Sequence, residues 1–148
     1  MRLSEDPPVD ARPVAEADFP FLFGLQESLR RPALEAAGGW DGAAEMARLR
    51  ATVRPGGDRI LVQAGRDIGV LCLTLEPGRL WLRRIQLLPE CQGRGVGTAV
   101  VRALLADARC DGLPVFLRVR RDNPAVRLYR RLGFRVTGGD EARLEMTA

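Results

Sequence analysis

The chain has 148 residues and a formal net charge of +4, and its composition excludes several kinds of chemistry. All 23 basic residues are arginine, so no lysine can form a Schiff base, and without histidine there is no Ser-His-Asp triad or imidazole metal ligand. Tyrosine and asparagine each occur once, as Tyr129 and Asn123. A chain of this length is typical of one globular domain, which we expect to span residues 1–148.

The first half of the chain predicts two helices and then three strands. We expect residues 1–10 to be a loose lead-in. Apolar spacing predicts a helix over Asp18–Arg31, interrupted by Pro32 and Gly38-Gly39, and a second helix over Asp41–Val53. Three β-like runs separated by glycine-containing turns follow, at Ile60–Ala64, Ile68–Leu75 and Leu80–Leu88.

The second half alternates helices and strands. A glycine-rich loop, Gln92–Gly97, leads into a helix that ends near Cys110, and Val115–Val119 is the next strand. Asn123-Pro124 predicts the start of a short helix, which Gly133 ends. Two closing strands are expected at Phe134–Thr137 and Ala142–Met146. This order predicts an α+β (mixed α/β) fold with one parallel crossover.

The cysteines and the apolar content bear on compartment and metal binding. Cys72, Cys91 and Cys110 are widely spaced and follow no metal-ligand pattern, which favours reduced thiols and no metal. Met1–Phe19 has no signal-peptide apolar core, and no stretch of 18 apolar residues occurs. We therefore predict a cytoplasmic protein without a membrane span.

The glycine-rich loop indicates an anion site. Glycines there let backbone N–H groups approach a ligand, a helix N-terminus adds partial positive charge, and Arg94 adds a full one. The spacing does not match the dinucleotide-binding pattern G-x-G-x-x-G, and the following strand closes on arginines rather than on an acidic residue. On this loop alone, a pyrophosphate site and a merely tight strand-to-helix turn both remain open.

Three short motifs occur in order along the chain: Leu82-x-x-Ile85-x-Leu87-x-Pro89-Glu90-x-Gln92-x-Arg94-Gly95-x-Gly97, then Asn123-Pro124-Ala125 with Leu128-Tyr129, then Leu132-Gly133-Phe134. Together they resemble the GNAT superfamily of acyl-CoA-dependent N-acyltransferases, although Ala125 stands one place early. Gly39-Trp40-Asp41 is similar to a motif of small bacterial members. Taken singly, Asn123 also fits a plain helix cap and Tyr129 a core residue.

The resemblance implies a central, mostly antiparallel sheet with one splayed parallel strand pair, flanked by about four helices. It implies acetyl-CoA as co-substrate, with its pantetheine arm between the strands of Leu87 and Val115–Val119. The cofactor-binding residues carried over are Leu87, Gln92, Gly93, Arg94, Gly95, Gly97, Thr98 and Asn123.

The resemblance also implies the catalytic groups. The backbone N–H of Leu87 would bind the thioester oxygen, and Tyr129 would be the general acid for the CoA thiolate. Cys91 is expected to be an incidental thiol. The base that deprotonates the amine is left unassigned, because Glu27, Glu76 and Glu90 have no spacing argument behind them.

The acceptor is expected to be a primary amine of a small molecule or peptide, selected mainly by Asp18–Val53. Arg83, Arg84 and Gln86 form a hypothetical site for an acceptor carboxylate. The alternatives are a non-catalytic CoA-binding regulatory domain and an arginine-rich nucleic-acid-binding domain. The latter is disfavoured because aromatic residues are only 5% of the chain. A monomer and a homodimer are both compatible with the sequence.

Overall fold

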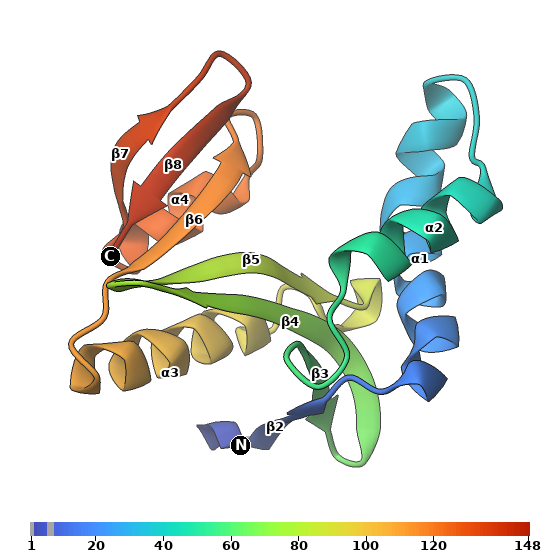
Figure 1. Cartoon of the computed structure of the whole chain (residues 1–148). Helices are drawn as coiled ribbons and strands as arrows, with labels where there is room; N and C mark the ends of the chain where they lie inside the picture. Colours follow the sequence, from blue (N-terminus) through green and yellow to red (C-terminus); the bar gives the residue numbers. More distant parts are fainter. Residues whose placement is uncertain (1, 6–7) are drawn as a thin grey trace.

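A single eight-stranded sheet organises the computed structural model, which describes residues 2–5 and 8–148 (Figure 1). The strand order is β1-β2-β3-β4-β5-β6-β8-β7, and within the described residues only β5 and β6 pair in parallel. The strands are β1 (Arg2–Glu5), β2 (Pro8–Pro13), β3 (Arg59–Gln63), β4 (Arg66–Glu76), β5 (Arg79–Leu87), β6 (Val115–Arg120), β7 (Arg135–Gly139) and β8 (Arg143–Thr147).

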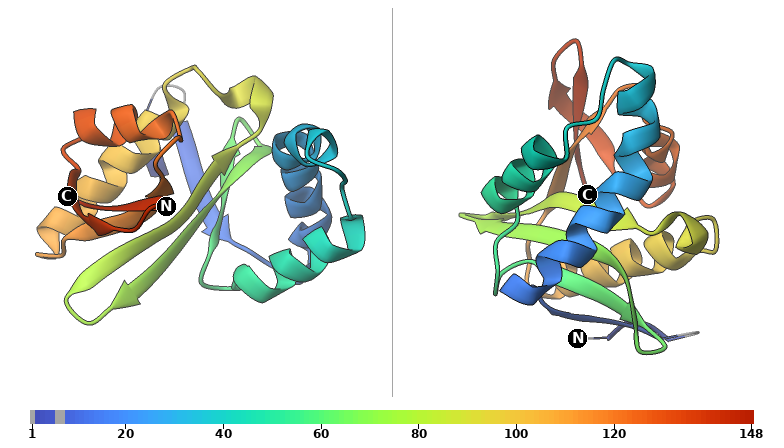
Figure 2. Two further views of the ribbon diagram at one scale, coloured as in Figure 1. Left: turned by 90° about the horizontal axis from the view of Figure 1, so that it is seen from above. Right: turned by 90° about the vertical axis from the view of Figure 1, so that its right-hand side faces the viewer.

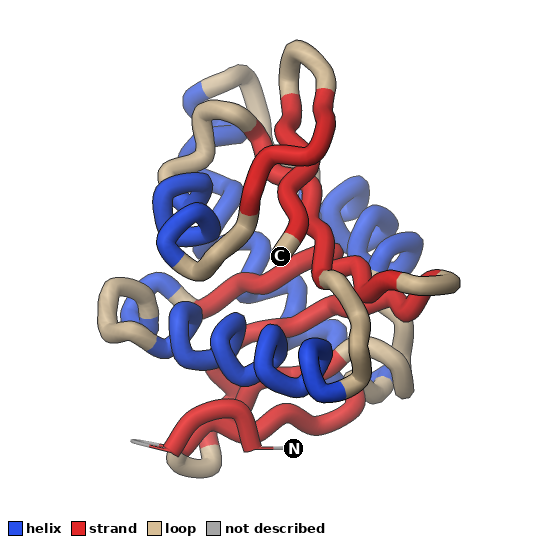
Figure 3. Tube along the Cα trace, turned by 90° about the vertical axis from the view of Figure 1, so that its left-hand side faces the viewer, coloured by secondary structure: helices blue, strands red, loops and turns tan. Residues whose placement is uncertain are grey.

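Four α-helices cover the two faces of this sheet (Figure 2). Helices α1 (Phe19–Ala36) and α2 (Gly42–Thr52) lie together on one face. Helix α3 (Val96–Cys110) runs along β4 and β5 on the other face, where α4 (Ala125–Arg131) also packs (Figure 3). No helix in the described part of the chain is long and apolar enough to cross a membrane.

The arrangement confirms the expected α+β class, with its mostly antiparallel sheet, its single parallel pair and its four flanking helices. The expectation of a loose lead-in over residues 1–10 is wrong, because β1 occupies Arg2–Glu5 and β2 begins at Pro8. The reason lies in side-chain alternation: Val9 and Ala11 both point into the core, which is the period of a half-buried strand.

Helix α1 is longer than the sequence predicts, since it passes through Pro32 and ends at Ala36. Arg31, the residue before the proline, forms ion pairs on the helix surface with Glu27 one turn before (3.0 Å) and with Glu35 one turn after (2.7 Å). The residues beyond Pro32 are good helix formers, so the helix continues until the glycine pair at Gly38-Gly39, whose φ angles are +124° and +156°.

Two apolar cores, one on each face, hold the helices to the sheet. Leu22 and Leu25 of α1 pack with Ile60, Val70 and Cys72 on the first face. On the second face the α3 side chains meet the sheet, with Val100, Leu104, Leu71, Leu117 and Met146 among the buried residues. Because both cores exclude water, a charge buried within them must be paired.

The principal buried charge is Asp58, whose side chain is 0% exposed. Its carboxylate accepts two hydrogen bonds from the Arg83 guanidinium, at 2.8 and 3.1 Å. It also accepts from the backbone N–H groups of Arg54 (2.8 Å) and Leu73 (3.3 Å), while Arg83 donates to the carbonyl of Thr52. The pair thus ties the end of α2 to strands β4 and β5.

Arg83 occupies an irregular position in β5. Cys72 of β4 pairs with Arg84, and the next residue, Leu73, pairs with Leu82, so Arg83 is an extra residue that forms a β-bulge. The parallel pairing of β5 with β6 covers only Leu80↔Val115 and Trp81↔Phe116, just before this bulge. Beyond it the two strands diverge (Figure 1), which opens the sheet at its centre.

We predict that Asp58→Ala lowers the free energy of unfolding by about 3–5 kcal/mol, because it leaves the buried Arg83 charge without its partner. Urea denaturation measures this loss. The matched control is Asp122→Ala, which removes the exposed Asp122–Arg120 pair (3.2 Å) and should leave the midpoint unchanged. Replacing both Asp58 and Arg83 by apolar residues should recover most of the loss; a double variant as unstable as Asp58→Ala would contradict this explanation.

Candidate active site

The loop Gln92–Gly97 joins β5 to α3 in a conformation that two glycines permit. Gly93 has φ +72° and Gly95 has φ +81°, both in the left-handed region that side-chain-bearing residues rarely adopt. The side-chain amide of Gln92 donates to the carbonyl of Leu87 (3.1 Å) and so fixes the loop to the end of β5. The first N–H groups of α3 have no partner within the helix and are available to an anion.

A cavity of about 420 Å³ lies in front of this loop, and we call it the loop cavity. Its walls come from β5, the loop, α3 and α4, with Leu29 of α1 at one side. Of the predicted cofactor-binding residues, six line it: Leu87, Gln92, Gly93, Gly95, Gly97 and Thr98. The structure therefore brings most of the predicted set to one place.

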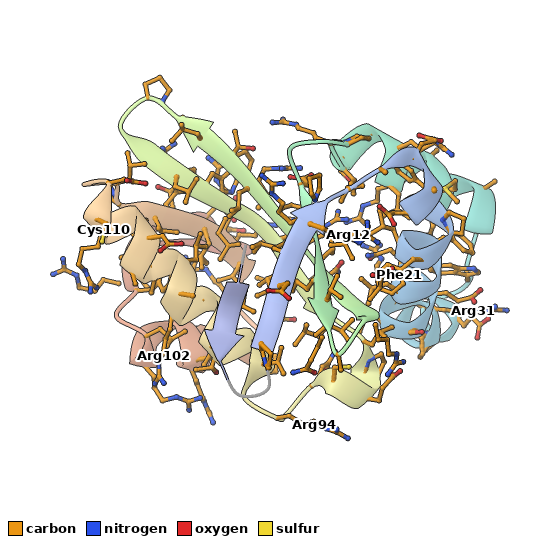
Figure 4. The ribbon with its side chains drawn as sticks, turned by 90° about the horizontal axis from the view of Figure 1, so that it is seen from below. Arg12, Phe21, Arg31, Arg94, Arg102 and Cys110 are labelled. Atoms are coloured by element: carbon orange, nitrogen blue, oxygen red, sulfur yellow. The ribbon has the colours of Figure 1, made fainter. Side chains whose placement is uncertain are left out.

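Two predicted residues, Arg94 and Asn123, lie outside the loop cavity. Arg94 is exposed, and its side chain points away from the body of the molecule (Figure 4). The side-chain oxygen of Asn123 accepts a hydrogen bond from the backbone N–H of Ala125 (2.9 Å). Asn123 thus caps the first turn of α4 from one residue before the N-cap position, which is Pro124 and not Asn123 as the sequence predicts, and it lines a different cavity.

That second cavity, of about 520 Å³, lies on the other side of β5 between α2 and β6. None of its lining residues is acidic, and seven are arginines, so we call it the arginine cavity: Arg48, Arg54, Arg83, Arg84, Arg118, Arg120 and Arg143. The two cavities share three wall residues, Ile85 and Gln86 of β5 and Tyr129 of α4. They meet where β5 and β6 diverge.

Tyr129 stands at this meeting point, with its ring edge-on to Phe134 at 5.6 Å between centroids. Burial raises the pKa of its hydroxyl, because ionisation would place a negative charge in a poorly hydrated site. The hydroxyl is therefore protonated at neutral pH. Tyr129 is thus part of the wall that the two cavities share.

The backbone N–H of Leu87 faces the loop cavity. The next residue, Leu88, donates its N–H to Ile68 of β4 (2.8 Å), and successive N–H groups of a strand point to opposite sides. Before the bulge, an even-numbered residue of β5 points its N–H group toward β6: the N–H of Leu80 donates to the carbonyl of Pro114, the residue just before β6 (2.9 Å). The extra residue Arg83 reverses this alternation, so the odd-numbered Leu87 faces the divergent side.

The three glutamates considered as bases are all in ion pairs outside the two cavities. Glu27 pairs with Arg31, and Glu76 pairs with Arg79 at 2.9 Å. For Glu90, its own backbone N–H and the nearby Arg66 lower the pKa of the carboxyl. Among the residues that the structure describes, no aspartate or glutamate lines either cavity, so none of them is placed there as a carboxylate base.

Several wall residues were not predicted as site residues from sequence. Arg118 and Arg120 alternate with the buried Leu117 and Val119 on β6, a pattern that could have placed both on one exposed face. Gln26 of α1 is buried and donates to the Gln86 side chain (2.6 Å), which holds Gln86 at the meeting point. No local motif marks that contact, because 60 residues separate the two glutamines.

The cysteines take no part in either cavity. Cys72 and Cys91 are buried and Cys110 is exposed, all as free thiols. Burial raises the pKa of the Cys72 thiol to about 12, so it is inert at neutral pH. In the part of the chain that the structure describes, no three His, Cys, Asp or Glu side chains gather to hold a metal ion.

Similar solved structures share this fold at low sequence identity. The PaiA N-acetyltransferase of Thermoplasma acidophilum, in complex with coenzyme A, superimposes with a TM-score of 0.68 at 18% identity, covering 94% of this chain and 97% of that one. Arabidopsis thaliana Naa50, in complex with the bisubstrate analogue CoA-Ac-MVNAL, gives a TM-score of 0.63 at 16% identity, with 94% and 96% covered.

Sequence comparison gives the family. The chain is 46% identical over 55 residues to the GCN5-like protein acetyltransferase Rv2170 of Mycobacterium tuberculosis, a match that covers 36% of this chain and about a quarter (27%) of that relative. The model of the Acetyltransferase (GNAT) family matches residues 25–134, which include β5, the glycine loop and Tyr129. The chain therefore belongs to the GNAT acetyltransferase family.

Proposed function

We propose that the protein is an N-acetyltransferase that moves the acetyl group of acetyl-CoA to a primary amine of a small molecule or peptide. The observation that carries this proposal is the pair of cavities on either side of the divergence of β5 and β6, which meet at Ile85, Gln86 and Tyr129. One cavity suits the cofactor and the other the acceptor, and the reacting atoms would meet at the shared wall.

The residues of the loop cavity fit coenzyme A. The left-handed glycines Gly93 and Gly95 present backbone N–H groups without side-chain obstruction, and the free N-terminus of α3 favours a pyrophosphate. The exposed edge of β5 suits the amide groups of a pantetheine arm, as an added strand would. Arg94 would act at longer range, as a charge at the mouth of the site.

The thioester supplies an activated acetyl group, and the chain supplies position and charge. In the reaction a C–N bond forms at the acetyl carbon as the C–S bond breaks. The N–H of Leu87 stabilises the oxygen on which negative charge develops, a contribution of about 3–4 kcal/mol. Tyr129 donates its proton to the departing thiolate, across a difference of about 1.5 pKa units before burial is counted.

The acceptor amine must lose a proton without a carboxylate in either cavity. The arginine cavity offers a different means, because nearby positive charges disfavour a protonated amine and lower its pKa. A larger fraction of the bound amine is then neutral and nucleophilic. Water in the cavity carries the released proton away.

The main competing function is a CoA-binding regulatory domain without turnover. It needs the loop cavity but neither the Tyr129 hydroxyl nor an acceptor cavity that meets it. A nucleic-acid binder would need an exposed basic surface, but it would need neither the loop cavity nor the meeting of the two cavities at Tyr129.

We predict that Gly95→Ala weakens coenzyme A binding about tenfold or more, measured by calorimetric titration. A side chain at φ +81° is strained, so the loop and the first turn of α3 must shift. The control is Gly78→Ala in the β4–β5 turn, at φ +76° and also with open space around it. Both variants should lose similar stability; equal loss of coenzyme A affinity in both would contradict a specific role for the loop.

We predict that Tyr129→Phe lowers kcat by about 10²–10⁴-fold in a thiol-release assay with acetyl-CoA and a panel of amines. The acetyl-CoA Kd should stay within about twofold, because the ring still fills its place. Since burial raises the pKa of the hydroxyl and keeps it protonated, Tyr129 should cause no fall in kcat as the pH rises from neutral into the mildly alkaline range. Unchanged turnover in Tyr129→Phe would remove it from the acid role.

A further inference from the structure

We propose that the acceptor amine carries an oxyanion, a carboxylate or a phosphate, which the arginine cavity binds through Arg84 and its neighbours. This inference rests on the proposed N-acetyltransferase function and specifies its substrate class.

The charge balance of the arginine cavity is the first argument. Ion pairs offset three of its seven arginines: Arg83 with Asp58 (2.8 Å), Arg120 with Asp122 (3.2 Å) and Arg118 with Glu145 (3.6 Å). The other four form no ion pair with any carboxylate in residues 8–148. The cavity thus keeps an excess of positive charge, which attracts an anionic ligand and is only partly offset by it.

The state of Arg84 is the second argument. Its Nη2 donates to the hydroxyl of Thr52 (3.2 Å), whereas its Nη1 is buried and donates to no atom in the described part of the chain. A buried donor on a charged group without an acceptor is costly. A bound oxyanion in the arginine cavity supplies the missing acceptor once the guanidinium turns to expose Nη1, in the two-pronged geometry that arginine prefers.

Arg83 and Arg84 therefore have different tasks, although they are neighbours. Arg83 is occupied by Asp58 and has a structural role. Arg84 pairs with Cys72 and Gln86 pairs with Val70, so both side chains lie on the face of β5 toward α1 and α2. Of the carboxylate site hypothesised from sequence, Arg84 is the member free to bind a ligand.

The position of Arg84 limits the size of the acceptor. Gln86, two residues further along β5, lies at the point where the cavities meet. Two residues of a strand span about 7 Å. The amine and the oxyanion of a good acceptor are thus separated by a few bonds only, as in an amino acid or a short aminoalkyl phosphate. Arg48 of α2, exposed at the same cavity, extends the positive surface outward.

The test uses primary amines in matched pairs with acetyl-CoA and the full chain: an amino acid against its amide, and an aminoalkyl phosphate against the amino alcohol. The charged member of at least one pair should show a kcat/KM at least tenfold higher. The pair with the larger ratio distinguishes carboxylate from phosphate. Equal rates within both pairs would overturn the proposal and leave the N-acetyltransferase function intact.

Arg84→Gln tests the residue. It should raise KM for the charged acceptor at least tenfold while the acetyl-CoA Kd changes less than twofold. The matched control is Arg102→Gln on the outer side of α3 (Figure 4), which should change none of these quantities. A fall in kcat alone, with KM unchanged, would contradict an acceptor-binding role.

A direct titration separates the two proposals. Inorganic phosphate, or a simple carboxylate without an amine, is added to the protein saturated with coenzyme A. Saturable binding that weakens at least tenfold in Arg84→Gln and not in Arg102→Gln supports the oxyanion site even if no amine is acetylated. Absence of such binding overturns it. Absence of coenzyme A binding, by contrast, overturns the proposed function.

Discussion

The β-bulge at Arg83 and its ion pair with Asp58 determine the geometry of the site. The extra residue ends the pairing of β5 with β6 and turns the N–H of Leu87 toward the opening. A bulge alone would leave a charged side chain in a core. Asp58 neutralises that charge and binds it to β4 and to the end of α2, so the irregular strand is fixed from both sides.

Arginine performs several separate tasks around this opening. It stabilises the bulge at Arg83, forms ion pairs on both sides of the proline of α1 at Arg31, and lines the arginine cavity with positive charge. Because a guanidinium stays protonated at any working pH, a wall of arginines cannot serve as a base. In the proposed reaction it would act instead by lowering the proton affinity of the substrate amine, a role that needs neither histidine nor lysine.

The features predicted from the sequence are those with local signals. Glycines at Gly93 and Gly95, the cap at Asn123 and the alternation of strand residues each have a cause within a few positions. The different positions of Arg83 and Arg84 could not be predicted. The sequence Leu82-Arg83-Arg84-Ile85 does not show which of the two arginines is the extra residue of the bulge. Asp58 follows Pro55-Gly56-Gly57 and has the appearance of a turn residue, although it is fully buried 25 positions from its partner.

The wall of Ile85, Gln86 and Tyr129 belongs to both cavities, and this has a thermodynamic consequence. The side chain of Gln86 is hydrogen-bonded to Gln26 of α1, so a shift of that helix would move a residue that lines both cavities. If a ligand in one cavity changes the affinity for a ligand in the other by some factor, the second ligand must change the affinity for the first by the same factor. The equilibrium coupling between the proposed cofactor and acceptor would therefore be a measure of how these three side chains are positioned.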